Sequence, residues 1–235
     1  MNSDRSTYVL IPGAWQGAWS WQPVARRLRA AGRAAVTLTL PGLADGDART
    51  GLHLADATGH VVSVIDDRDL RDVVLVGQSW GGYPLTAAAH QVAERVSRIV
   101  YYNAIVPRRG VPLIDENADY RQMLRAAIAA SPDGSVAVVP EQVPLLLPDS
   151  SEETRRLFFD LLVPHPGTYF TEAIDVDDVT GLGVPVDYLL SENDLALARP
   201  GTELAARIGR TPRMLPGGHE SMLTHPDAVA EALLT

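Results

Sequence analysis

Residues 72–82 read Asp72-Val73-Val74-Leu75-Val76-Gly77-Gln78-Ser79-Trp80-Gly81-Gly82, and this stretch is the strongest indicator of the architecture. Its apolar run over residues 72–76 predicts a buried strand, and helical spacing of apolar residues begins again over residues 82–92. A serine on the tight turn between a strand and a helix has strained backbone angles and points its hydroxyl away from the sheet. Glycines two residues before and after Ser79 let strand and helix approach without a Cβ clash. This context favours a nucleophilic role for Ser79 over that of a helix N-cap.

Strand-like and helix-like segments alternate on both sides of this turn. Further strands are expected at residues 8–11, 35–40, 99–102, 184–190 and 213–215. Further helices are expected at residues 21–31, 54–65, 202–208 and 227–234. Unbroken apolar strands separated by helices indicate a mostly parallel sheet that is covered by helices on both faces.

The alternation stops between Pro107 and Val179, where prolines recur around two helical stretches at residues 120–130 and 152–162. We interpret this segment as a helical cap inserted after the strand that ends near Tyr102. Residues 1–106 and 180–235 are then the core of the protein, and residues 107–179 form the cap.

A serine nucleophile needs a base, and the base needs a carboxylate that orients it. In a strand–turn–helix architecture of this kind, the acid and then the histidine follow on loops after later strands. The loop after residues 184–190 carries Glu192 and Asp194, and the loop after residues 213–215 carries His219. We predict Asp194 as the acid, ahead of Glu192, because it lies farther past the strand where the loop turns back. His219 follows two glycines and is predicted as the base.

The other five histidines fit structural roles better. His225 precedes Pro226 and is typical of a residue that begins a helix, whereas the remaining ones on the core fall in or beside helices: His53, His60 and His90. His165 lies between two prolines of the cap and is a candidate for the wall of a pocket.

These residues, and the stretch Val9-Leu10-Ile11-Pro12-Gly13-Ala14-Trp15-Gln16-Gly17-Ala18-Trp19, resemble the α/β-hydrolase superfamily over essentially the whole chain. The N-terminal stretch is similar to the small-cap subgroup, which includes methyl esterases, pyrethroid-type carboxylesterases and plant hydroxynitrile lyases. The resemblance implies an α/β-hydrolase fold and an oxyanion hole formed by the backbone amides of Ala14 and Trp80. The family's other location for the acid, after the strand ending at Tyr102, carries Asn103.

Two positions depart from the family's pattern. Pro12 replaces a histidine in the first loop, so the side-chain bonds that hold this loop must be made differently. Gln78 replaces the commoner histidine before the nucleophile, a change without an evident mechanistic reading in the sequence. Neither change removes the oxyanion donors, because these are backbone groups.

The implied activity is that of a serine hydrolase that cleaves a small to medium hydrophobic carboxylic ester through an acyl-enzyme. The predicted substrate-binding residues are Trp15, Trp80, Met123, Phe158, Tyr169, His165 and Met222. No metal or organic cofactor is expected, because this chemistry needs none. A lactonase that opens a hydrophobic, polyketide-like lactone remains an alternative, as do a non-hydrolytic enzyme and a ligand receptor on the same scaffold.

The composition excludes several other classes. Without cysteine there is no disulfide or thiol catalysis, and without lysine there is neither a phosphate-binding Gly-Lys loop nor the cyanide-binding lysine of the plant lyases. Leu223 stands where a zinc-binding helix that starts at His219 would need a second histidine. The net charge of −9 disfavours nucleic acid as a partner, and no apolar run approaches the ~20 residues that span a bilayer.

The expected partner is therefore the small hydrophobic ester or lactone itself, and the sequence leaves open whether the chain forms a homodimer. The first eight residues contain Asp4 and Arg5 and do not resemble a secretion signal, so we expect a cytoplasmic protein. The lysine-free, arginine- and alanine-rich usage is typical of a GC-rich bacterial genome.

Overall fold

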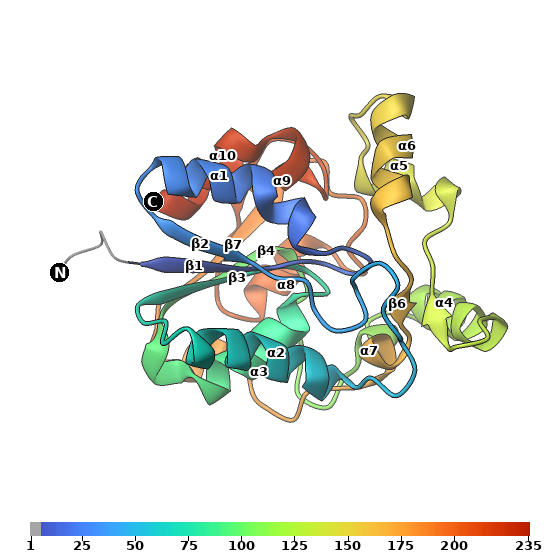
Figure 1. The fold of residues 1–235 in the computed structure, drawn as a ribbon, viewed down its shortest axis with the longest axis horizontal. Coiled ribbons are helices and arrows are strands. Elements are labelled where there is room, and N and C mark those ends of the chain that lie inside the picture. Colours follow the sequence, from blue (N-terminus) through green and yellow to red (C-terminus); the bar gives the residue numbers. More distant parts are fainter. Residues whose placement is uncertain (1–5) are drawn as a thin grey trace.

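Six parallel strands form the central sheet of the computed structural model, which describes residues 6–235 (Figure 1). The strands are β1 (Thr7–Ile11), β2 (Ala34–Thr37), β3 (Val73–Ser79), β4 (Val96–Ala104), β7 (Val186–Ser191) and β8 (Arg213–Leu215). They lie in the order β2-β1-β3-β4-β7-β8, and every neighbouring pair is parallel. The parallel sheet predicted from the apolar runs is therefore present. Asp4 and Arg5, which bear on the expected absence of a secretion signal, lie outside the described residues.

Helices cover both faces of the sheet, and alternate strand residues supply the two cores. One face carries α2 (Leu54–Asp67), α3 (Gly82–Gln91) and α8 (Gly201–Ala206); the other carries α1 (Gln22–Ala30), α9 (Ser221–Thr224) and α10 (Pro226–Leu234). In β3, Val73 and Leu75 enter the core under α2 and α3, whereas Val74 and Val76 enter the core under α1 and α10. Side chains of a strand alternate between its faces, so an unbroken apolar run is what a doubly covered strand requires.

Most predicted elements differ from the observed ones by a residue or more at an end, and the strand expected at residues 99–102 extends over Val96–Ala104. The first helix begins at Gln22 because residues 18–21 form a short 3₁₀ helix, η2 (Ala18–Trp21). Strand β2 ends at Thr37 instead of residue 40. Its neighbour β1 ends at Ile11, and Pro12 has no N–H to extend the ladder.

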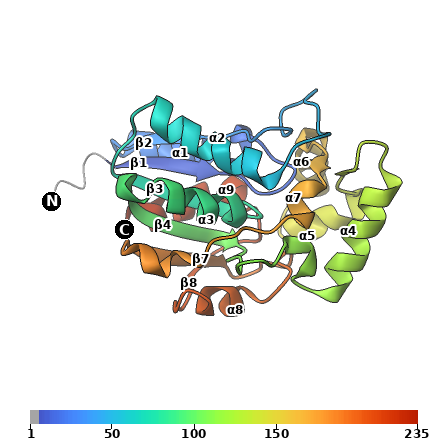
Figure 2. The same ribbon diagram turned by 90° about the horizontal axis from the view of Figure 1, so that it is seen from below.

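The segment that we predicted as a cap, residues 107–179, lies between β4 and β7 and extends past the end of the sheet, where Figure 2 shows α4, α5 and α6 together. Its elements are η4 (Leu113–Asp115), α4 (Ala118–Ala130), β5 (Ser135–Val136), η5 (Pro140–Gln142), α5 (Val143–Leu146), α6 (Glu152–Leu161), β6 (His165–Pro166) and α7 (Thr168–Thr171). The helix η6 (Val179–Leu182) leads back to β7. The cap has a small core of its own, formed by Val138, Val143, Leu146, Leu147 and Phe158.

The turn between β3 and α3 requires its glycines. A Cβ on Gly81 would lie 2.5 Å from the carbonyl oxygen of Pro12, and a Cβ on Gly82 would lie 1.9 Å from that of Ile105. Both distances are far below van der Waals contact, and both neighbours are backbone atoms that cannot rotate away. These glycines therefore let α3 pack directly against the ends of β1 and β4.

We predict that Gly82→Ala lowers the free energy of unfolding by about 3 kcal/mol or more, because the backbone around Ile105 must move. Gly59→Ala is the matched control: Gly59 lies inside α2, where an added Cβ meets nothing within 4 Å. This control should raise the free energy of unfolding by about 0.5–1 kcal/mol. Urea unfolding of both variants measures the difference, and wild-type stability of Gly82→Ala would contradict the packing described.

Candidate active site

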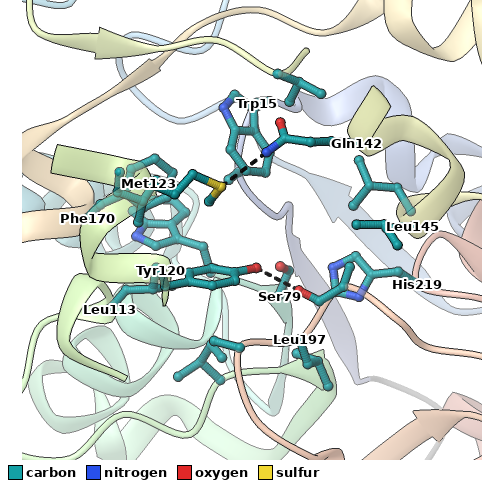
Figure 3. Close-up of a pocket in the computed structure, with 18 of the residues that line it drawn as sticks. Trp15, Ser79, Leu113, Tyr120, Met123, Gln142, Leu145, Phe170, Leu197 and His219 are labelled. Atoms are coloured by element: carbon teal, nitrogen blue, oxygen red, sulfur yellow. Dashed lines mark hydrogen bonds between the residues drawn. The ribbon is translucent and has the colours of Figure 1, made fainter. Parts of the chain in front are cut away.

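Three loops at the carboxyl edge of the sheet carry the residues that were predicted as a triad. Ser79 is the last residue of β3 and has a φ of 55°, a left-handed conformation that is strained for a residue with a side chain. Asp194 follows β7, and His219 follows β8. Ser79 and His219 line the same pocket, and Figure 3 shows them at the same end of it. The structure thus brings the predicted nucleophile and base to one site.

Asp194 is positioned to orient His219. The Nδ1 atom of His219 lies 2.8 Å from Oδ2 of Asp194, and both side chains are 2% exposed. A carboxylate can only accept, so Nδ1 donates this hydrogen bond and Nε2 is left as the basic nitrogen. The other carboxylate oxygen of Asp194 accepts from the backbone N–H of Ala196 at 2.9 Å. Glu192, the alternative acid, is exposed to solvent, and within residues 6–235 it forms no hydrogen bond with His219.

The pKa of His219 is raised above its ordinary value of 6.5. Burial by itself lowers this pKa, but the charge of Asp194 and the hydrogen bond to it favour the imidazolium and prevail. The site therefore stabilises the protonated imidazole, which is the form that a histidine takes after it has accepted a proton as a general base.

Asn103, which stands at the family's other acid position, ties the two loops together. Its φ is 44°, and its side-chain amide donates to the carbonyl oxygen of His219 at 3.0 Å. The Oδ1 atom of the same side chain accepts from the backbone N–H of Ser191 at 2.7 Å. The asparagine thus fixes the loop of the predicted base to the end of the strand that carries the predicted acid.

The loop after β1, residues 12–17, is the predicted oxyanion loop, and it is held from the cap. Trp15 has a φ of 66°, and its backbone N–H donates to Nδ1 of His165 at 3.2 Å. Its indole N–H donates to the carbonyl oxygen of Val136 at 2.7 Å. These two bonds hold the loop in place of the side-chain bonds expected from the histidine that Pro12 replaces. The amides of Ala14 and Trp80 donate none of the turn, loop or side-chain hydrogen bonds found within residues 6–235.

The state of His165 follows from this contact. Burial, helped by the positive charge of Arg49, lowers the pKa of His165 well below 6.5. The ring is therefore neutral at ordinary pH, and its Nδ1 is free to accept from Trp15.

The pocket above Ser79 encloses about 170 Å³ and is mostly apolar (Figure 3). Three of the predicted substrate-binding residues line it: Trp15, Trp80 and Met123. Further lining residues come from the cap and the loop after Asp194: Leu113, Tyr120, Leu124, Val138, Gln142, Leu145, Leu146, Phe170, Leu195, Ala196, Leu197 and Ala198. The Tyr120 hydroxyl is engaged with the carbonyl oxygen of Ala196 at 2.7 Å, which joins α4 to the acid loop. Apart from His219, the lining includes no charged or titratable side chain other than this tyrosine.

Four predicted substrate-binding residues do not line the pocket. Phe158 packs in the core of the cap, with its ring edge-on to Trp19 at 5.9 Å. Tyr169 stacks on Trp80 at 5.1 Å, behind the pocket wall, and His165 is fully buried beneath the predicted oxyanion loop. Met222 faces the core under α1 and α10, on the other side of the sheet. In each case the side chain packs between secondary-structure elements. The composition of the sequence does not reveal in which direction such a side chain points.

The pocket also contains residues that the sequence reasoning missed. The run Leu195-Ala196-Leu197-Ala198 directly follows the predicted acid, and Leu195 is 60% exposed. An apolar run in a loop beside a predicted catalytic residue is a signal that could have found this wall. Gln142 and Leu145, from η5 and α5, carry no comparable signal. Among residues 6–235, no group of three or more His, Asp or Glu side chains is arranged to hold a metal ion.

The sequence model of the alpha/beta hydrolase family matches residues 8–232. A curated relative, a carbendazim hydrolyzing esterase from Nocardioides sp. (strain SG-4G), is 34% identical over 111 residues, which are 46% of each chain. Methylesterase 1 from Arabidopsis thaliana is 32% identical over 110 residues, 44% of this chain and 41% of that one. The chain thus matches less than half the length of these curated relatives.

Among solved structures, an extracellular α/β-hydrolase from a Paenibacillus species superimposes with a TM-score of 0.90. It is 26% identical and the match covers 97% of both chains; it is described as sharing structural and functional homology with tobacco salicylic acid binding protein 2. Both the fold class and the resemblance expected from the sequence are confirmed by these matches.

We predict that Asp194→Asn lowers the pKa of His219 by roughly 1–3 pH units, because burial then acts without the opposing carboxylate. An NMR titration of the imidazole in both proteins measures the change. An unchanged or raised pKa of His219 would show that Asp194 does not control its protonation.

Proposed function

The chain belongs to the alpha/beta hydrolase family, and we propose that it is a serine esterase that cleaves small to medium hydrophobic carboxylic esters. The observation that carries this proposal is the 2.8 Å hydrogen bond between Asp194 and His219, at a pocket that also contains Ser79. The names of the matched relatives, a carbendazim hydrolyzing esterase and a methylesterase, support ester hydrolysis.

Acylation begins with attack of the Ser79 hydroxyl on the ester carbonyl carbon. Nε2 of His219 accepts the serine proton as the bond forms, and the Asp194 carboxylate stabilises the resulting imidazolium. The carbonyl oxygen becomes an oxyanion that accepts from the backbone N–H groups of Ala14 and Trp80. Each such donor contributes about 3 kcal/mol to lowering the barrier.

The tetrahedral intermediate then collapses. The imidazolium of His219 gives its proton to the leaving alcohol, and the acyl group stays on Ser79. Water enters, loses a proton to the same Nε2 and attacks the acyl carbonyl. Release of the carboxylic acid returns the proton to Ser79, so the enzyme ends in its starting state.

The pocket supports an uncharged, apolar substrate. Its lining offers no arginine that could pair with a carboxylate or phosphate, and Gln142 is its one side-chain amide. A cavity of roughly 150 Å³ holds a group the size of benzene, so about 170 Å³ accommodates one aryl or short branched group, with the rest of the ester at the mouth. A lactone would be opened by the same steps, and the shape of the pocket does not favour it over an ester.

Ser79→Ala should lower kcat/KM for activated aryl esters by ~10³–10⁶ because it removes the nucleophile. Ser97→Ala is the matched control. Ser97 lies near the start of β4, whereas Ser79 pairs with the end of that strand, so the variant should stay within about threefold of wild type. Steady-state kinetics on a panel of aryl and short-chain esters and hydrophobic lactones also identifies the preferred class. A burst of product without turnover in wild type would instead point to a ligand receptor, and unchanged hydrolysis by Ser79→Ala would contradict Ser79 as the nucleophile.

Met123→Trp should fill part of the pocket, because Met123 lines it from α4. We expect kcat/KM to fall by about tenfold or more for esters with an aryl acyl group and by less than threefold for acetate esters. Leu157→Trp is the control, since Leu157 is 56% exposed on α6 and does not line the pocket. Equal effects of Met123→Trp on large and small esters would contradict acyl binding in this pocket.

A further inference from the structure

Three buried polar side chains meet behind the catalytic loops: Gln16, Gln78 and Glu220. Gln16 belongs to the predicted oxyanion loop, Gln78 precedes the nucleophile and Glu220 follows the base. Glu220 and Gln78 are fully buried and Gln16 is 2% exposed. None of them lines the pocket, and the proposed mechanism uses none of them. We call these three residues the buried cluster.

The buried cluster connects the three catalytic loops. Nε2 of Gln16 donates to Oε1 of Glu220 at 2.7 Å, and Nε2 of Gln78 makes a long, 3.4 Å bond to the carbonyl oxygen of His219. The Gln78 side chain also lies beside Glu220. Its Oε1 packs so closely on Gly13 that a Cβ there would lie 2.0 Å away. A shift of any one loop would therefore disturb the other two.

The cluster has more acceptors than donors. Three buried oxygens have no hydrogen-bond partner within residues 6–235: Oε1 of Gln16, Oε1 of Gln78 and Oε2 of Glu220. An ionised Glu220 offers acceptors only and cannot pair with a glutamine carbonyl. No arginine forms an ion pair with Glu220 in the described part of the chain, and an unpaired buried carboxylate is costly. A single proton on Oε2 would supply a donor and satisfy two of the three oxygens at once.

We propose that Glu220 is a positioning residue held as a neutral carboxylic acid, whose Oε2–H donates to a glutamine carbonyl of the buried cluster and so locks the three catalytic loops in register. The catalytic consequence rests on the proposed esterase function, whereas the protonation state does not. The proposal also gives Gln78 a role: its amide donates to the histidine loop, and its Oε1 is one of the two unpartnered glutamine carbonyls of the cluster within residues 6–235.

The charged and titratable groups around Glu220 agree with the neutral form. Burial raises the pKa of Glu220 to about 7 against the opposing effects of His219, Gln16 and Gln78, and nearby Asp194 raises it further. Tyr102, on β4, also faces Glu220, and its own pKa is raised by burial, so the tyrosine is neutral too. The imidazolium of His219 then has a single full negative partner, Asp194.

Protonation can be tested by the pH dependence of stability. An unfolded chain releases the Glu220 proton near the ordinary pKa of 4.5, whereas the folded chain keeps it to about pH 7. Wild type must therefore lose stability relative to Glu220→Gln as the pH rises from 5 to 8. The ratio of their unfolding equilibrium constants, wild type over variant, should grow at least about tenfold over this range in urea titrations. A ratio that is constant or falls with pH would overturn the proposal.

Glu116→Gln is the matched control for this measurement. Glu116 is equally buried, but it is bonded to Arg199 and Arg207, and these arginines lower its pKa despite its burial. Its stabilising charge is present above pH 4.5 and is lost only at lower pH. Glu116→Gln should therefore be less stable than wild type by a nearly constant amount between pH 5 and 8. A slope there like that of Glu220→Gln would show that the comparison reports something other than Glu220, and would count against the proposal.

The positioning role is tested by kinetics at pH 6 with an ester that wild type hydrolyses. Glu220→Gln keeps the shape of the neutral acid, so its kcat should stay within about tenfold of wild type. The kcat of Glu220→Leu should be at least about tenfold lower than that of Glu220→Gln, with little change in KM. Gln78→Met, which removes one of the two unpartnered glutamine carbonyls and the bond to the His219 carbonyl, is the second variant and should also lower kcat more than KM. Equal activity of all three with wild type would overturn the positioning role. Failure of Ser79→Ala to slow hydrolysis would instead contradict the proposed esterase and leave the stability comparison intact.

Discussion

The hydrogen bond between Asp194 and His219 joins the loops that follow β7 and β8. The arrangement of these strands in the sheet brings the two side chains within hydrogen-bond distance. Strands β7 and β8 pair in parallel register, with Ser191 opposite Leu215, so both loops leave the sheet at the same edge. Asn103 then fixes the base loop to the end of β7. Ser79 emerges beside them on a strained turn whose shape is permitted only because glycines let α3 approach the sheet. The site is thus a consequence of strand order and of close backbone packing.

The cap lines the pocket and also holds the predicted oxyanion loop through Trp15. Trp15, in the predicted oxyanion loop, is bonded through its backbone to His165 and through its indole to Val136, and both partners belong to the cap. The same residue forms part of the pocket wall. The conformation of the predicted oxyanion loop is therefore coupled to the packing of the cap. Where the family's loop uses a histidine, this chain uses Pro12 and bonds from the cap.

The sequence allowed the fold and the proposed triad to be predicted because both depend on local signals. Apolar runs mark strands that are covered on both faces, and the loops after β7 and β8 hold few residues able to serve as acid and base. The pocket was predicted less well. Tyr169 and Phe170 are adjacent aromatics of α7, yet one stacks behind Trp80 and the other faces the cavity. Which of them points inward depends on tertiary packing. The proximity of Gln78 and Glu220 depends on it too, and neither can be predicted from the spacing of residues in the sequence.

The proposed mechanism requires a covalent bond between the acyl group and the Ser79 hydroxyl. Intact-protein and peptide mass spectrometry after quenching at low pH, during hydrolysis of an activated aryl ester, tests for it without assuming a natural substrate. We predict an acyl adduct confined to Ser79, and its absence when His219 is replaced by alanine. Hydrolysis that proceeds with no adduct, or with the acyl group on another residue, would contradict the proposed mechanism.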